Sequence, residues 1–181
     1  MSTQLVFETH STSVDNERGI ATGWLQGELS ATGREQALLL GQRRRDDGVD
    51  LVVSSDLRRA VETAELAFAG SAIPVRHDHR LRECNYGDWN GMPRARLEAE
   101  RLRRVDVPFP GGESWREAVQ RHAGFLDELA GAGRRRVLLI GHVATRWALD
   151  HLLNGVPLER LAAEKFRWHE GWEYLLDEKM R

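Results

Sequence analysis

The sequence contains a single cysteine, Cys84, and no apolar run long enough to cross a lipid bilayer. One cysteine excludes an intramolecular disulfide, and nothing else in the chain indicates an oxidising compartment. The first residues also lack the basic and then apolar pattern of a secretory signal. We therefore expect a cytoplasmic protein without membrane contact.

Several common catalytic motifs are missing too. The chain has no GxxxxGK[ST] phosphate loop, no GxSxG nucleophile elbow, no paired CxxC zinc site and no GxGxxG motif after a strand. His77 and His79 have a metal-like spacing, but two ligands without clear partners do not define a zinc site. The formal net charge of −2 gives no bias toward nucleic acids. We predict no metal, no cofactor and no nucleic-acid partner, and leave a homo-oligomer open.

Short apolar segments alternate with helical patterns along the 181 residues, a length that suits one domain over residues 1–181. Strands are expected at residues 5–7, 51–54, 73–76 and 137–140. Helices are expected from a Ser30 cap to near Gly48, from an Asp56 cap to Phe68, over about 113–129, and from His142 to Gly155. The tail, residues 166–176, is expected to add a strand or hairpin. This order predicts an α/β three-layer sandwich, a mostly parallel central sheet with helices on both faces.

Two histidines each follow an expected strand. His10 comes soon after the first strand, and His142 comes after Gly141 at the end of the last one. The carboxyl ends of parallel strands lie at one edge of a sheet, where ligands bind, so the two imidazoles could meet in one pocket. Taken alone, either histidine is more often held by a local hydrogen bond. Their meeting therefore decides the functional interpretation.

Other candidates lie at element ends. Arg58 and Arg59 begin an expected helix, whose free N–H groups attract anions, and only one of the two can face a pocket. Glu83 could donate a proton if burial raised its pKa, with Asp88 as its competitor. The loops over about 85–110 are expected to set specificity.

Three further features of the chain have less decisive interpretations. The specificity loops include Trp89, Phe109 and the very basic segment 94–104, which favours either a second anionic group or a solvated helix face. Trp168 and Trp172 flank His169 in the tail. We interpret them as core or interface aromatics, because the chain lacks the basic stripe that accompanies a base-stacking platform.

Six ordered segments resemble the histidine phosphatase superfamily, also called phosphoglycerate mutase-like. Residues 9–16 are similar to the family's Arg-His-Gly-Glu-Thr with a following Asn, which puts His10 and Asn16 in register. Residues 54–64 are similar to Ser-Ser-x-Leu-x-Arg-Ala-x-x-Thr-Ala, and this match selects Arg59 over Arg58. The remaining matches are 29–37, 81–91, 110–114 and 141–142. The resemblance extends from Leu5 to about Leu153.

The resemblance implies a mechanism and a site. His10 would attack phosphorus and become phosphorylated, Glu83 would protonate the leaving oxygen, and His142 would bind phosphoryl oxygens. Arg59 would clamp the phosphate, with Asn16, Thr9 and Ser11 as further phosphate-binding positions. The implied function is metal-independent hydrolysis of a small phosphorylated metabolite through a phosphohistidine.

The chain also departs from the family pattern. Thr9 stands where the family has its first arginine, and Ser11 and Val143 stand where it has glycines. Arg82 or Arg146 could swing in to replace the lost guanidinium, the substrate could carry its own complementary group, or the pocket could be reused. The alternatives to a phosphatase are thus a non-catalytic anion binder, a non-phosphatase reaction in the same pocket and, ranked low for lack of long insertions, a phosphomutase.

Overall fold

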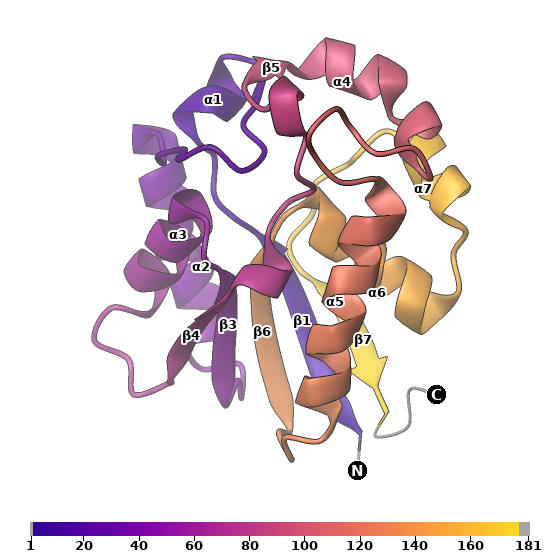
Figure 1. Cartoon of the computed structure of the whole chain (residues 1–181). Coiled ribbons are helices and arrows are strands. Elements are labelled where there is room, and N and C mark those ends of the chain that lie inside the picture. Colours follow the sequence, from indigo (N-terminus) through magenta and orange to yellow (C-terminus); the bar gives the residue numbers. More distant parts are fainter. Residues whose placement is uncertain (1, 178–181) are drawn as a thin grey trace.

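The centre of the protein is a five-stranded sheet with the strand order β4-β3-β6-β1-β7 (Figure 1). The structure is a computed structural model, and it describes residues 2–177. Strands β1, β3, β4 and β6 run parallel, and β7 pairs antiparallel with β1. The strands span β1 Thr3–Thr9, β3 Leu51–Ser55, β4 Val75–Asp78, β6 Arg136–Gly141 and β7 Trp172–Leu176.

Two pairs of helices cover the two faces of this sheet (Figure 1). On one face, Val6, Val52 and Leu138 pack with the helical residues Leu40 and Ala64. Alternate strand residues face the other way, onto the second pair, as expected for strands buried on both sides. The pairs are α2 Ala31–Arg44 with α3 Arg58–Phe68, and α5 Trp115–Ala130 with α6 Val143–Asn154. The predicted α/β sandwich with a mostly parallel sheet is confirmed.

Local side-chain chemistry sets most of the helix ends. The Ser30 hydroxyl accepts the Gly33 N–H at the start of α2, and Ser114 forms a capping box at the start of α5. Gly155 ends α6 with a φ of 68°, which glycine adopts without strain. The predicted Asp56 cap is wrong. Helix α3 starts later, at Arg58, because the Asp56 carboxylate is occupied by the guanidinium of Arg82.

Short elements form a roof over the carboxyl ends of the parallel strands (Figure 1). Tyr86, Phe109, Trp115 and Trp147 pack together beneath the roof and hold it to α5 and α6. Sequence patterns predicted only loops here, because the elements are short. They are α1 Val14–Glu17, β2 Ile20–Ala21, β5 Met92–Pro93, α4 Arg94–Glu100, α7 Leu158–Ala163 and the 3-10 turns His79–Leu81, Gly87–Trp89 and Leu102–Arg104.

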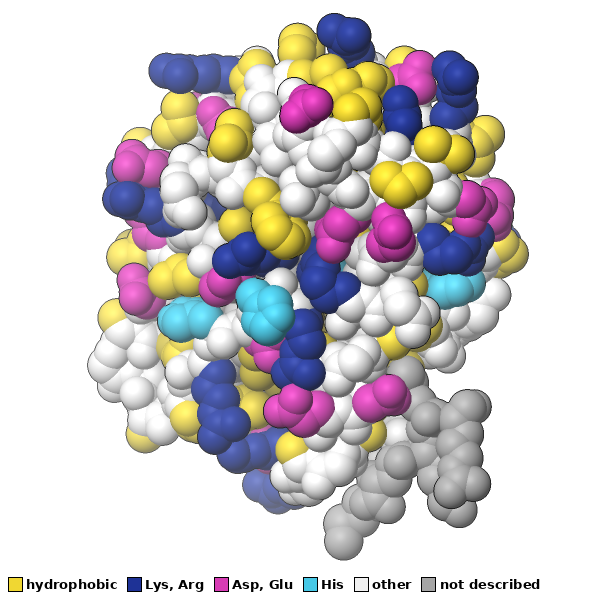
Figure 2. All heavy atoms as spheres, in the orientation of Figure 1, with side chains coloured by type: hydrophobic (Ala, Val, Ile, Leu, Met, Phe, Trp, Pro, Cys, Tyr) yellow, Lys and Arg dark blue, Asp and Glu magenta, His cyan; other side chains and the backbone are white. Residues whose placement is uncertain are grey.

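The tail closes the sheet on its β1 side. Trp172 is buried in the core, and Tyr174 pairs with Leu5 in the antiparallel register, so the predicted extra strand is confirmed. Basic and acidic side chains are interspersed over the face seen in Figure 2. Among residues 2–177, none of the helices is long and apolar enough to cross a membrane.

Candidate active site

A cavity of about 690 Å³ opens at the carboxyl ends of β1 and β6, under the roof. It is lined by His10 and His142 from the two strand ends, Arg59 from the first turn of α3, and Glu83 from the loop after the first 3-10 turn. The sheet order explains the meeting, because β1 and β6 are hydrogen-bonded neighbours with Thr9 opposite Gly141. Strand adjacency therefore brings the two distant histidines together.

The His10 imidazole is fixed by its own loop. Its Nδ1 lies 2.7 Å from the Ser11 carbonyl oxygen, so Nδ1 carries the proton and donates it. The lone pair then sits on Nε2 and accepts a hydrogen bond of 3.3 Å from Nε of Arg59. Burial, and then the charge of Arg59, lower the pKa of His10 to about 3. The ring is therefore neutral near pH 7, with Nε2 as its unprotonated nitrogen.

The Arg59 guanidinium contacts both histidines. Its Nη2 donates to the Gly23 carbonyl oxygen at 2.9 Å and lies 3.3 Å from Nδ1 of His142. The residue is only 3% exposed, and burial lowers the pKa of its guanidinium. No carboxylate in residues 2–177 forms an ion pair with it. By contrast, Arg58 is exposed and pairs with Glu28 at the surface.

His142 sits at the N-cap of α6, 5.0 Å from His10 between ring centroids. Burial, and then the charge of Arg59, hold the pKa of His142 well below its usual range. With Nδ1 facing the guanidinium, the ring proton belongs on Nε2, and this buried atom has no hydrogen-bond partner in the described structure. Gly141 before it permits the close approach of Thr145, whose Oγ1 would lie 2.4 Å from any added Cβ.

Glu83 presents a buried carboxyl group to the same cavity. Its Oε1 accepts the N–H groups of Cys84 at 2.9 Å and Ala144 at 3.0 Å. Burial is the largest influence and raises the pKa of Glu83, although the two N–H donors and Arg59 oppose it. Asp88, the competitor, is exposed and does not line the cavity. The arrangement thus combines a neutral nitrogen nucleophile, two cation or donor groups and a carboxylic acid.

A model of the histidine phosphatase superfamily (branch 1) matches residues 5–170. The chain belongs to this superfamily. Phosphoserine phosphatase 1 of Hydrogenobacter thermophilus is 32% identical over 171 residues, or 87% of this chain and 79% of that protein. A 2,3-bisphosphoglycerate-dependent phosphoglycerate mutase of Cytophaga hutchinsonii is 31% identical over 172 residues, or 87% and 80%.

A solved structure gives the same result. The complex of mycobacterial glucosyl-3-phosphoglycerate phosphatase with VO3 matches with a TM-score of 0.76 and 32% identity, covering 89% of this chain and 86% of that one. The predicted family and fold are therefore confirmed. Membership of the histidine phosphatase superfamily, with phosphatases among the relatives, supports a phosphoric monoester hydrolase.

Three more predicted positions of this histidine phosphatase lie between the end of β1 and α1. Thr9 and Ser11 line the cavity, and the Ser11 N–H donates to Oγ1 of Thr63. Asn16 also lines it, while its Oδ1 accepts the Ser13 N–H in the cap of α1. The loop is thus held from two sides, by α3 and by its own short helix.

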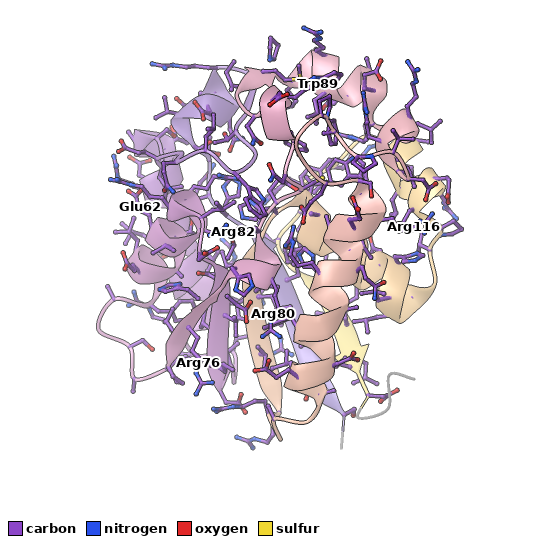
Figure 3. The ribbon with its side chains drawn as sticks, viewed as in Figure 1. Glu62, Arg76, Arg80, Arg82, Trp89 and Arg116 are labelled. Carbon is purple, nitrogen blue, oxygen red and sulfur yellow. The ribbon has the colours of Figure 1, made fainter. Side chains whose placement is uncertain are left out.

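The two proposed replacement arginines lie outside the cavity lining. Arg82, labelled in Figure 3, makes a bidentate pair with Asp56 at 2.7 Å and stacks 4.6 Å from the ring of Trp24. Arg146 pairs with Asp150 at 2.6 Å and lies over Trp172. In this structure each guanidinium is therefore held by a charged pair away from the cavity, and swinging either one inward would break that pair.

Arg94 at the start of α4 does line the cavity, and sequence reasoning assigned it only to the basic segment 94–104. Its Nη2 donates to the Asn16 carbonyl oxygen at 3.4 Å, and its charge helps to lower the pKa of His10. Within residues 2–177 no ion pair joins it to a carboxylate. Leu97 and Arg101 line the cavity as well, whereas Trp89 and Phe109 pack on one another.

The described residues contain no group of three or more His, Cys, Asp or Glu side chains placed to hold a metal ion. His77 instead shares a hydrogen bond of 2.8 Å with the Ser54 hydroxyl, and His79 points into solvent with 72% of its side chain exposed. The two histidines of this His-x-His pair therefore lie in different environments, one hydrogen-bonded and one exposed to solvent.

Proposed function

We propose that the protein is a metal-independent phosphatase that hydrolyses a small phosphorylated metabolite through a phosphohistidine on His10. The observation that carries this proposal is the hydrogen bonding of His10. Because Nδ1 faces the Ser11 carbonyl oxygen, the lone pair is on Nε2, where it accepts a hydrogen bond from the guanidinium of Arg59 that a phosphoryl oxygen could replace. A nitrogen nucleophile next to a cation suits attack on an anionic phosphoryl group.

In the first step, Nε2 of His10 forms a bond to phosphorus while the bond from phosphorus to the ester oxygen breaks. Glu83, whose pKa is raised by burial, gives its proton to the leaving oxygen and releases the alcohol. Arg59 and the partnerless Nε2–H of His142 donate to the phosphoryl oxygens as charge develops on them. Protein donors supply the positive field, so no metal is required.

In the second step, water replaces the histidine. The ionised Glu83 takes a proton from the water, whose oxygen attacks phosphorus as the bond to Nε2 breaks. Inorganic phosphate leaves, and both His10 and Glu83 return to their starting protonation states. The same carboxyl group thus acts first as an acid and then as a base.

Arg94 takes the role that the family resemblance gives to an arginine at position 9. Thr9 carries no charge, and the ion pairs of Arg82 and Arg146 hold those two guanidinium groups elsewhere. Arg94 is the cavity arginine besides Arg59 that forms no ion pair within the described chain. Since it begins α4 in the roof, the phosphate clamp would be shared between the sheet and the roof.

The names of the relatives support a small phosphorylated substrate. They include a phosphoserine phosphatase and a glucosyl-3-phosphoglycerate phosphatase, both named for soluble metabolites. We propose the same class of substrate here.

The proposal is tested by trapping the intermediate. The protein is mixed with a ³²P-labelled phosphomonoester and quenched in alkali, where phosphohistidine survives and phosphoserine does not. Wild type should retain label and His10→Ala should not, while His79→Ala, a change to an exposed histidine, should label like wild type. Undiminished hydrolysis by His10→Ala would overturn the proposal.

A further inference from the structure

One wall of the cavity carries large apolar side chains that remain open to solvent. Leu39 of α2 is 52% exposed, Phe166 is 39% exposed and Trp168 is 57% exposed, and all three line the cavity. Single exposed apolar residues are ordinary, but a group of them around a cavity marks a surface that a ligand covers. Trp168 is therefore not a core residue, while the predicted interface role stays a prediction.

The wall begins next to the proposed phosphoryl site and leads away from it. Gln36 of α2 accepts hydrogen bonds from the backbone N–H and the hydroxyl of Thr12, two residues after His10. Leu39 lies on the same helix face one turn further, about 5 Å along the axis at 1.5 Å per residue. The proposed phosphoryl site and the wall therefore line one continuous cavity.

The tail segment that completes the wall is tied to α2 by charge. Nη1 of Arg43 lies 3.7 Å from Glu170, and its Nη2 lies 3.6 Å from the buried carboxylate of Glu8. Phe166 leans on the core residue Trp172, with ring centroids 6.0 Å apart. Trp168 pairs with no aromatic ring among residues 2–177. These contacts anchor the wall, while the face of the Trp168 indole makes no aromatic contact in the described chain.

We infer that this wall binds an aromatic ring in the alcohol portion of the substrate, so that the preferred substrates are phosphomonoesters of ring-bearing alcohols. The inference rests on the proposed phosphatase function. A cavity of about 690 Å³ is much larger than a phosphoryl group requires, and it falls in the size range of sites for larger ligands. Stacking on one tryptophan is worth roughly five- to a hundredfold in affinity.

The test compares two esters that differ by an aromatic base, ribose 5-phosphate and adenosine 5′-monophosphate. Wild type should prefer the ring-bearing ester in kcat/KM by about tenfold, in line with one stacking contact. Trp168→Ala and Leu39→Ala should reduce that preference, mainly through a higher KM for the nucleotide. Leu38→Ala is the matched control, because Leu38 is the 49% exposed neighbour on α2 and does not line the cavity.

Calorimetry on the His10→Ala protein separates this inference from the proposed function. Adenosine 5′-monophosphate should bind more weakly when Trp168→Ala is added, even though no turnover occurs. Equal dissociation constants with and without Trp168→Ala would overturn the ring site and leave a phosphatase. If the trapping test showed no phosphohistidine on His10 but binding still depended on Trp168, the phosphatase proposal would fall and only the binding site for the ring would stand.

Contact between copies of the chain is the competing use of the same wall. If Trp168→Ala changed the sedimentation coefficient and left the ratio of the two esters unchanged, the wall would be a subunit contact and the inference would be wrong. A monomer before and after the substitution, together with a lowered ratio, supports the ring site.

Discussion

Nε of Arg59 lies 3.3 Å from Nε2 of His10, so a guanidinium touches the one nitrogen of the imidazole that is free to react. The contact helps to keep the ring neutral, because protonating Nε2 would set two positive charges against each other. An incoming phosphoryl group would meet the lone pair and the cation together.

Replacing Arg59 with lysine should lower kcat/KM about ten- to hundredfold, the worth of one charged hydrogen bond. A lysine keeps the charge but cannot reach Gly23 and both histidines with one planar group. Arg58→Lys is the control, since its guanidinium pairs with Glu28 at the surface. Equal steady-state rates for the two variants would contradict the assigned clamp.

Glu83→Gln should affect substrates according to their leaving group. The kcat/KM for alkyl phosphates, which reports the first step, should fall about 10²- to 10⁴-fold, the usual worth of a general acid. The kcat/KM for p-nitrophenyl phosphate should fall much less, because nitrophenolate leaves without a proton. Asp88→Asn, at an exposed carboxylate of the next loop, should change neither rate. Equal losses on both substrates would exclude Glu83 as the proton donor.

The pH dependence of hydrolysis also tests Glu83 as the proton donor, and the direction of the expected change follows from its pKa. Burial raises the pKa of Glu83, so the acid form persists to a higher pH than for an ordinary glutamate. The kcat/KM for alkyl esters should fall as pH rises through that pKa, and the kcat/KM for p-nitrophenyl phosphate should not. Stopped assays across the pH range measure both limbs, and an identical alkaline fall for both esters would contradict the assignment.

Arg94→Gln should weaken inhibition by inorganic phosphate about tenfold, because it removes one charged contact. Adding Thr9→Arg to that variant should recover part of the loss, since it restores a guanidinium at the end of β1. Arg96→Gln is the control on the same helix, because Arg96 lies over Trp89 and does not line the cavity. A double variant no better than Arg94→Gln would show that the two positions do not share a role.

Buried histidines should make the protein less stable in acid. Burial lowers the pKa of His122 to about 3, where its ring bridges Ala118 and Thr145. Between pH 6.5 and about 3 the unfolded chain binds this proton and the folded one does not, so stability falls as pH falls. His122→Gln should reduce the slope of unfolding free energy against pH by about 1.4 kcal/mol per unit, measured by urea titration. An unchanged slope would contradict it.

The sheet and the pair of histidines were predictable because strand patterns fix positions along the backbone. Apolar runs ended at the strand ends that precede His10 and His142, and parallel strands present those ends at one edge of the sheet. Their neighbouring order in the sheet, β6 beside β1, was not predictable from periodicity and came only with the structure.

The place of Arg94 in the cavity lining was not predictable, because a side chain's surroundings depend on tertiary contacts. Arg82 looked available beside Glu83, but Asp56 from a distant loop takes its guanidinium. Arg94 gave no local signal beyond a basic segment, since its place depends on how the short α4 folds over the site. Whether Trp168 lay in the core was not predictable for the same reason, as exposure depends on packing of the tail.

The partnerless charge of Arg59 also links folding to ligand concentration. Folding buries the guanidinium between two neutral imidazoles and leaves it without a carboxylate in the described chain, so an anion completes the site. A ligand that binds only the folded state stabilises it by about 2.7 kcal/mol at a hundred times its Kd. Bound phosphate or substrate would therefore add to the free energy of unfolding. Without a bound anion, local unfolding would be easiest around this site.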